Sequence, residues 1–196
     1  MNRKPGSAPD RVDVGPDAEA VLVGRIGAGD QQAFAEFYVL YRRRLARFLG
    51  RFLASRDTVD ELINDVMFVI WQEAAGFEAR SRVSTWVFGI AWHKALRALE
   101  RQRRHDARTG PEPEQMPAAE GTNLDERDWL RRGLDRLSPE HRMVVELAFY
   151  VGCSYEEIAT IANCPVNTVK TRMFHARHRL QGILKDLDAT HTGRRP

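Results

Sequence analysis

Basic side chains are concentrated on one short segment in the C-terminal third of the chain. Between residues 166 and 180, apolar residues recur at spacings of three and four, and many of the other positions carry lysine, arginine or histidine, with no acidic residue. This pattern predicts a helix with one buried face and cationic remaining faces. Because the DNA major groove admits an α-helix and cationic side chains bind phosphates, we expect this helix to contact DNA.

The residues before this helix complete a helix-turn-helix pattern. Ser154 is a favourable N-cap, and Glu157 three residues later completes a capping box, so a short helix begins here. Residues 163–165 interrupt the pattern, and Pro165 suits the beginning of the next helix. An ordinary helical hairpin with a solvated basic face explains the same residues equally well. Evidence for DNA binding must therefore come from the rest of the chain.

A second cationic stripe lies between residues 86 and 104. It consists of Lys94, Arg97, Arg101 and Arg104, at spacings of three and four on a predicted helix. The aromatic and imidazole side chains at its beginning are Trp86, Phe88, Trp92 and His93. Rings that stack on bases, beside cations that bind phosphates, suit single-stranded nucleic acid. The alternative is that Trp86 is a core residue and the stripe is solvated.

Acidic and apolar residues share another predicted helix, which begins at Asp57 or Thr58 and ends before Gly76. Its acidic and amide residues are Asp60, Glu61, Asn64 and Asp65, and its apolar residues beside them are Leu62, Val66, Phe68 and Val69. More apolar surface than one core stripe requires, bordered by acids, predicts a protein partner. Packing of Phe68 or Val69 on a neighbouring helix is the alternative.

Helical periodicity also accounts for the segments that position these residues. A helix capped by Asp30 carries an aromatic-rich stripe of Phe34, Phe37, Tyr41, Leu45, Phe48 and Phe52. A helix over 124–137 is expected to bury Trp129, Leu130, Leu134 and Leu137, and Ser138 caps the next one. No segment shows the period-two alternation of a strand, so we predict an all-α fold.

Composition divides the chain into two small helical domains. Residues 109–123 contain three prolines, two glycines and three glutamates but no lysine or arginine, which predicts a flexible acidic linker. We therefore expect an N-terminal tail over 1–16, a first domain over 17–108, the linker over 109–123, a helix-turn-helix domain over 124–187 and a C-terminal tail over 188–196.

Other function classes find little support in the sequence. The motifs of phosphate-binding loops, zinc proteases and serine or cysteine hydrolases are missing, so we expect no enzyme and no cofactor. Cys153 and Cys164 are expected to be small buried thiols. His175 and His178 nearby leave a zinc site as the alternative, but no paired CxxC motif accompanies them. No run of signal-peptide or membrane-spanning length appears, which predicts a cytoplasmic protein.

Taken together, these motifs resemble those of the extracytoplasmic-function sigma factors, compact two-domain relatives of the primary bacterial sigma factors. The resemblance covers about residues 18–187. Its carriers are DELINDVMFVIWQEA, the Thr85-Trp86 step before a basic helix, the acidic linker, and the segment from LSPEH to ARHRL. It implies a transcription initiation factor that joins core RNA polymerase, directs it to the −10 and −35 elements of promoters and helps to open the DNA.

The resemblance also assigns residues to three surfaces. The surface expected to dock on the clamp of the largest polymerase subunit consists of Asp60, Glu61, Leu62, Asn64, Asp65 and Phe68. The residues expected to bind the −10 element, including a flipped-out base, are Arg80, Ser81, Arg82, Ser84, Thr85, Trp86, His93, Lys94 and Arg97. Those expected at the −35 element are Thr168, Lys170, Thr171, Arg172, Phe174, His175 and Arg177.

The same resemblance implies further partners for this chain. It implies contact with the flap of the second-largest polymerase subunit and regulation by an anti-sigma protein, which would sequester the chain at the membrane.

The family usually has arginine at the position of His175, so the guanine contact there is expected to be weaker or pH-dependent. Gly89, Trp92 and His93 also differ from the common pattern, which predicts an unusual −10 preference. A stand-alone helix-turn-helix repressor or activator is the alternative function, and a pure interaction module is a third.

Overall fold

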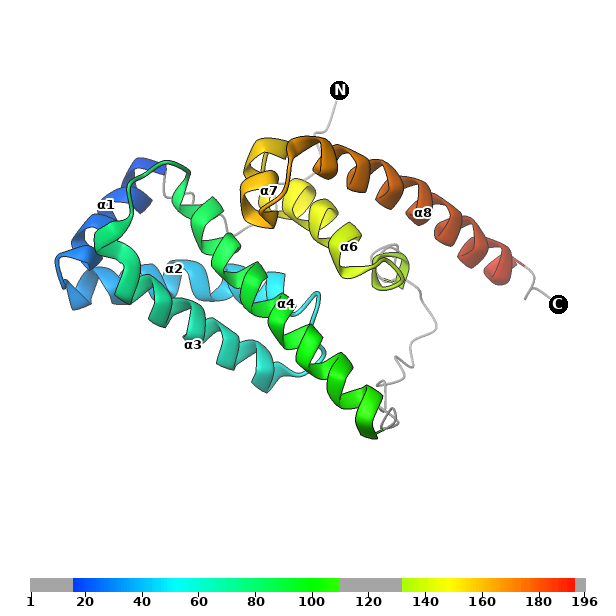
Figure 1. Cartoon of the computed structure of the whole chain (residues 1–196), viewed down its shortest axis with the longest axis horizontal. Helices are drawn as coiled ribbons and strands as arrows, with labels where there is room; N and C mark the ends of the chain where they lie inside the picture. The colour runs from blue at the N-terminus through cyan, green and yellow to red at the C-terminus, as the bar shows by residue number, and fades with distance from the viewer. Residues whose placement is uncertain (1–15, 110–131, 193–196) are drawn as a thin grey trace, which may run out of the picture.

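The computed structural model describes residues 16–109 and 132–192, with side chains described for 17–108 and 132–185. All regular structure in these two ranges is helical (Figure 1). The N-terminal domain contains α1 (Pro16–Gly27), α2 (Gln31–Leu49), α3 (Arg56–Glu73), the short η1 (Ala74–Gly76) and α4 (Val83–Thr109). The C-terminal domain contains α6 (Pro139–Glu146), the π-helical turn η2 (Leu147–Val151), α7 (Tyr155–Ala162) and α8 (Val166–Thr192). The all-α fold is therefore confirmed.

The aromatic stripe of α2 forms the centre of the N-terminal core. Phe37, Tyr41, Leu45 and Phe48 are fully buried and Phe34 is partly buried, as the spacing predicts. Phe52, expected on the same helix, lies three residues beyond the end of α2 and is also partly buried. The Tyr41 hydroxyl donates a hydrogen bond of 2.7 Å to the buried carboxylate of Glu19 in α1. Burial raises the pKa of Tyr41, so this phenol stays protonated and ties α1 to α2.

Capping interactions set the helix beginnings. Asp30 caps α2 by accepting a hydrogen bond from the Ala33 amide, which together with Arg25 lowers the pKa of its carboxyl. Helix α3 begins at Arg56, one or two residues earlier than the sequence predicts, because Ser55 is its N-cap and its side chain accepts a hydrogen bond from the Thr58 amide. Ser55 and the predicted Asp57 or Thr58 all have side-chain oxygens that can cap a helix, so the sequence alone does not show which of them is the N-cap.

The helix-turn-helix is confirmed in detail. Ser138 caps α6, and Ser154 with Glu157 forms the complete capping box that begins α7. Asn163 adopts a left-handed conformation with φ of 47° at the end of α7, which turns the chain into α8. Val169, Met173 and Ala176 in α8 are buried, and Val166 and Leu180 are partly buried, as expected.

One predicted domain boundary differs from the structure, and several other predictions lie outside the described residues. Helix α8 continues to Thr192, so residues 188–192, expected in a tail, are helical. The expected N-terminal tail up to residue 15, nearly all of the linker, and Trp129 and Leu130 lie outside the described residues. Leu134 and Leu137 are buried as predicted.

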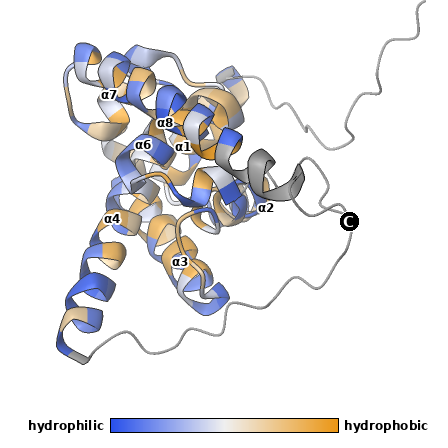
Figure 2. Ribbon diagram, turned by 90° about the vertical axis from the view of Figure 1, so that its right-hand side faces the viewer, coloured by the Kyte–Doolittle hydropathy of each residue, from blue (hydrophilic) through white to orange (hydrophobic). Residues whose placement is uncertain are grey.

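The two domains pack directly against each other. In Figure 1, α7 lies beside the N-terminal half of α4, and buried residues of both domains belong to one continuous apolar cluster. The C-terminal turns of α4 extend away from this packing and are mostly hydrophilic (Figure 2), and residues 101–108 are all exposed. Within the described part of the chain, no helix is apolar for long enough to cross a lipid bilayer.

Candidate protein and nucleic-acid interfaces

An exposed apolar groove runs between α2 and α3. It is lined by Gln31, Phe34 and Tyr38 from α2 and by Asn64, Met67, Phe68 and Trp71 from α3. Phe68 is 60% exposed, and the Trp71 ring meets the Phe34 ring edge to face at 5.2 Å. The Tyr38 hydroxyl donates a weak hydrogen bond of 3.4 Å to the Asn64 side chain. The groove therefore presents aromatic surface that no other described residue covers.

Most residues predicted to bind a protein partner lie beside or in this groove. Asp60, Glu61, Asn64, Asp65 and Phe68 are all exposed on α3. Leu62 was predicted to lie on the same surface, and this was wrong, because its side chain is 3% exposed and packs in the domain core. The sequence analysis missed Tyr38 and Trp71. Trp71 follows Phe68 by three residues, and this spacing on one helix face was the signal available.

Lys94 connects two of the predicted surfaces. Its ammonium lies 3.1 Å from the Asp65 carboxylate, and its side chain is only 25% exposed. A residue expected to bind DNA is thus paired with one expected to bind protein. Neither the α3 pattern nor the α4 pattern alone reveals this contact, because it depends on how the two helices pack.

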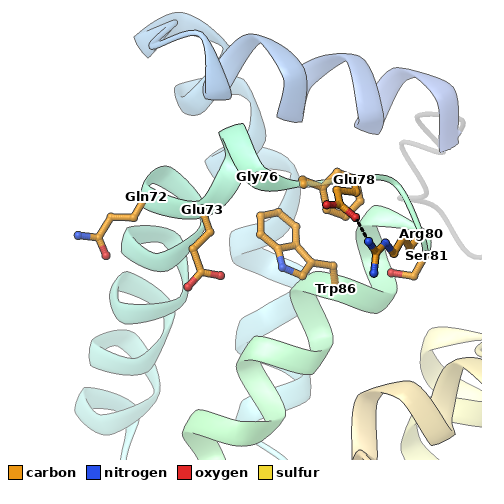
Figure 3. A pocket seen from close by; sticks show the side chains of 8 residues that line it. Gln72, Glu73, Gly76, Glu78, Arg80, Ser81 and Trp86 are labelled. Atoms are coloured by element: carbon orange, nitrogen blue, oxygen red, sulfur yellow. Dashed lines mark ion pairs between the residues drawn. The ribbon is translucent and has the colours of Figure 1, made fainter.

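A pocket of ≈ 500 Å³ lies where the loop 77–82 crosses between α3 and α4. Its lining residues are Gln72, Glu73, Gly76, Phe77, Glu78, Arg80, Ser81 and Trp86. Figure 3 shows the Trp86 indole facing the pocket and an ion pair between Arg80 and Glu78 at its edge. Trp86 packs on the Phe77 ring at 4.8 Å with the ring planes 32° apart. The pocket therefore combines an aromatic wall with a polar edge of two carboxylates and one guanidinium, which suits a flat, polar ligand such as a nucleobase.

The predicted −10 residues do not all lie on this open surface. Trp86, Arg80 and Ser81 line the pocket, and Ser84 is partly buried nearby. Thr85 is only 2% exposed, and its hydroxyl donates to Glu157 of α7. Gln72, Glu73, Phe77 and Glu78 were missed, since no periodicity marks them.

The aromatic residues of α4 divide between surface and core. Phe88 and Trp92 are buried, against Phe48 at 5.1 Å and Phe52 at 5.3 Å, so the suggestion that they stack on bases was wrong. His93 is exposed at the beginning of the stripe. The cationic residues Arg97, Arg101 and Arg104 are exposed along the same helix.

The second helix of the helix-turn-helix presents most of its predicted DNA contacts to solvent. The exposed residues are Lys170, Thr171, Phe174, His175 and Arg177, whereas Thr168 and Arg172 are partly buried. Thr171 donates its hydroxyl hydrogen to the Asn167 carbonyl of the preceding turn. The opposite side of α8 is anchored in the core, so the exposed side is held in a fixed orientation.

Histidines and cysteines complete the surroundings of this helix. The His141 ring lies 6.3 Å from the His175 ring, and burial together with Arg179 and His175 lowers the pKa of His141. Cys153 and Cys164 are free and partly buried, and burial beside Glu157 raises the pKa of the Cys153 thiol to about 12. Among the described residues, no three histidine, cysteine, aspartate or glutamate side chains are grouped to hold a metal ion.

Comparison with known proteins gives the same assignment for both halves of the chain. Residues 37–105 match the family model of sigma-70 region 2, and residues 127–180 match that of sigma-70 region 4. The ECF RNA polymerase sigma-E factor of Escherichia coli strain K12 is 31% identical over 188 residues, which cover 86% of this chain and 95% of that protein.

Solved structures show the same arrangement of helices. The sigma factor RpoE of Bartonella quintana, crystallised with the anti-sigma factor NepR, is 27% identical and superposes with a TM-score of 0.64 over 78% of this chain and 96% of that one. CnrH, solved in complex with the cytosolic domain of CnrY, shares the fold at 24% identity, with a TM-score of 0.65 over 87% of this chain and 99% of that one.

Proposed function

This chain belongs to the extracytoplasmic-function sigma factors, transcription initiation factors that direct RNA polymerase to promoters, and we propose that its three surfaces divide this task. The N-terminal domain, within residues 17–108, binds core polymerase and the −10 element. The C-terminal domain, within residues 124–187, binds the −35 element, and residues 109–123 link the two. The chain itself forms no covalent bond during this work, which takes place in the cytoplasm with the polymerase.

The groove between α2 and α3 is the proposed docking site for the clamp of the largest polymerase subunit. Its exposed Phe68 and Trp71 offer aromatic anchors, and Asp60, Glu61 and Asp65 surround them with negative charge. Buried aromatic anchors within a polar rim are the usual composition of an energetically strong interface. We propose in addition that α6–α8 contacts the flap of the second-largest subunit.

The pocket beside Trp86 is the single observation that carries the DNA-opening role. A base can be read after it leaves the duplex only if a pocket receives it, and extrusion costs a few kcal/mol. Stacking on one aromatic ring contributes about 1–3 kcal/mol, which offsets much of that cost. The exposed Arg80 and Arg82 are placed to contact the adjoining phosphates.

At the −35 element, the exposed side of α8 is proposed to enter the major groove. Lys170, Thr171, Phe174 and His175 are the candidates for base contacts. Thr168, Arg172 and Arg177 are assigned to phosphates, with Arg177 held 5.7 Å from the Phe149 ring. An imidazole at position 175 offers at most two hydrogen-bond donors where a guanidinium offers five, so the contact there is expected to be weaker.

An anti-sigma protein is the proposed negative regulator, by likeness to the Bartonella quintana sigma factor that was solved with its anti-sigma factor. The uncovered groove between α2 and α3 is one surface that such a protein would occupy. A purified candidate encoded beside this gene should then compete with core polymerase for the chain. Simultaneous binding of both would contradict a shared site.

The experiment that tests the proposed function is promoter-specific transcription with purified core polymerase. Promoters are first enriched from a randomised duplex library by the reconstituted holoenzyme. Replacing Trp86 by alanine should then reduce open-complex formation more than it reduces binding of closed duplex, because the pocket acts only after a base is extruded.

A further inference from the structure

A side chain of α6 lies beside the proposed DNA-binding side of α8. The two helices run side by side (Figure 1), and the His141 ring of α6 lies 6.3 Å from the His175 ring of α8, with the ring planes 61° apart. His175 is exposed and is a proposed base contact, whereas His141 is half-buried. An imidazole from outside the helix-turn-helix therefore borders the proposed −35 surface.

Hydrogen bonds at the beginning of α6 fix the orientation of the His141 ring. The Ser138 hydroxyl oxygen accepts the 3.4 Å capping hydrogen bond from the His141 amide, so its own hydrogen is free to be donated to Nδ1 of the same residue at 2.9 Å. Neutral His141 then carries its proton on Nε2. Within residues 17–108 and 132–185, the structure shows no acceptor for that proton, so Nε2 is a donor available to a ligand.

Cationic side chains of α8 surround this imidazole. Those that face His141 are Arg179, His175 and Arg172. Burial and these cations lower the pKa of His141, and Glu140 on its own helix opposes them. Residues 166–180 of α8 contain no aspartate or glutamate. The site therefore combines excess positive charge with an available donor, which suits an anionic ligand.

DNA phosphates are the anions that this site meets if α8 enters the major groove. In helix-turn-helix proteins the recognition helix lies in the groove, while a neighbouring helix crosses the backbone. His141 is the third residue of α6, within the first turn, where the helix dipole also favours negative charge. The position of His141 and the charge around it thus both favour a phosphate.

We propose that His141 binds a phosphate of the −35 element through Nε2, and that this contact takes up a proton. The proposal rests on the −35 assignment made above, and it adds a contact from α6 to those of α8. In the free chain, the cations around His141 favour its neutral form. A phosphate oxygen at Nε2 offsets this charge, so the complex favours the imidazolium, whose hydrogen bond to an anion is also the stronger one.

Proton uptake makes the affinity for DNA depend on pH. The pKa of His141 is lowered in the free chain, and a bound phosphate raises it again, so association takes up a proton between the two values. Affinity therefore increases as the pH falls through about 6.5, the ordinary pKa of histidine. For one proton the increase is at most about tenfold per pH unit.

The test measures binding of a duplex by the reconstituted holoenzyme between pH 7.5 and 5.5, the range in which histidine titrates. The duplex carries the −35 element of a promoter enriched by the holoenzyme and ends upstream of the −10 element. His141→Gln is the main variant, because glutamine keeps a hydrogen-bond donor but takes up no proton in this range. His105→Gln is the matched control, since His105 is exposed on α4 outside the proposed surfaces.

Neutral methylphosphonates, placed one at a time along the −35 backbone, identify the phosphate itself. Removing the charge of the partner phosphate should weaken binding by the unmodified chain and abolish its pH dependence. The same probe should cause little further loss in His141→Gln, because the two changes remove one interaction. A general disturbance of the fold would not single out one phosphate, and thermal unfolding checks that each variant remains folded.

We expect the unmodified chain and His105→Gln to bind more tightly as the pH falls, by up to about tenfold per unit, and His141→Gln to lose most of this dependence. His175→Gln should weaken binding at every pH but keep most of the dependence. An equal pH dependence in His141→Gln overturns the proposal, as does a dependence that no single methylphosphonate abolishes.

Lys170→Ala distinguishes failure of this proposal from failure of the −35 assignment. It should weaken binding of the same duplex if α8 enters the groove, whatever His141 does. Weaker binding by Lys170→Ala together with an unchanged pH dependence in His141→Gln would reject the phosphate contact alone. Unchanged binding by Lys170→Ala would reject the −35 assignment, and the proposal with it.

Discussion

The ammonium of Lys94 in α4 lies 3.1 Å from the carboxylate of Asp65 in α3. This pair places the beginning of the cationic stripe against the acidic surface of the groove. Charge reversal at Asp65 would therefore disturb Lys94 as well as any polymerase contact. A test of the docking surface is cleaner at Phe68, an exposed apolar side chain that lines the groove and carries no charge to pair with the stripe.

Replacing Phe68 by alanine should weaken binding to core polymerase by roughly 5- to 30-fold, because loss of an aromatic anchor at an interface typically costs about 1–2 kcal/mol. The side chain is 60% exposed, so the fold should be unaffected. Val39→Ala is the matched control, since Val39 is 77% exposed on α2 but does not line the groove. Equal affinities of the two variants, measured by fluorescence anisotropy, would remove the groove from the docking surface.

Replacing Trp86 by alanine should lower the rate of promoter opening by about 5- to 150-fold, which corresponds to the 1–3 kcal/mol of one stacking contact. Trp86→Phe should retain most of the activity, because a ring remains. Permanganate reactivity of unpaired thymines measures the open complex. Since Trp86 also packs on Phe77, the melting temperature of each variant has to be measured alongside. Similar rates of promoter opening by the alanine and phenylalanine variants would exclude stacking of a base on the side chain at position 86.

Replacing Lys170 by alanine should weaken promoter binding and reduce the slope of log affinity against log salt by about 0.9, the value for one phosphate contact. Lys185→Ala is the control on the same helix, because Lys185 is also exposed but lies about 22 Å further along the axis at 1.5 Å per residue. Its slope should equal that of the unmodified chain. The same slope in both variants would mean that Lys170 does not face DNA.

Stability is expected to decrease as the pH falls below about 6.5, the ordinary pKa of histidine. Burial, Arg179, His175 and Arg172 lower the pKa of His141 in the folded chain, and Glu140 opposes them. The unfolded chain therefore binds a proton at a higher pH than the folded chain, so acid favours unfolding. Thermal unfolding between pH 7.5 and 5.5 measures the effect, and His141→Gln should show a smaller loss over this range. An equal loss in both proteins would assign the pH dependence to other groups.

Periodicity predicted the elements well, because most helices are set by local signals. The stripe around Phe37 and Tyr41 and the capping box of Ser154 and Glu157 depend only on residues within a few turns of one another. The same holds for the exposed face of α8, whose orientation follows from the buried positions of that helix.

Contacts between helices could not be predicted in this way. The sequence makes Phe88 and Trp92 candidates for base stacking, but Phe48 of α2 and Phe52, three residues beyond the end of α2, pack against them. Thr85 carries no sequence signal for burial, because its partner Glu157 is 72 residues away. The pocket likewise depends on how the loop 77–82 places Phe77 over Trp86. Functional surfaces that arise from packing between distant segments require the three-dimensional arrangement.

Run-off transcription with purified core polymerase tests the central claim most directly. Added to core enzyme and a library of promoter fragments, the chain should produce transcripts that begin at a fixed distance downstream of paired −35 and −10 sequences, and none without the chain. Tight duplex binding by the chain alone, with no polymerase-dependent transcript from any fragment, would contradict the account.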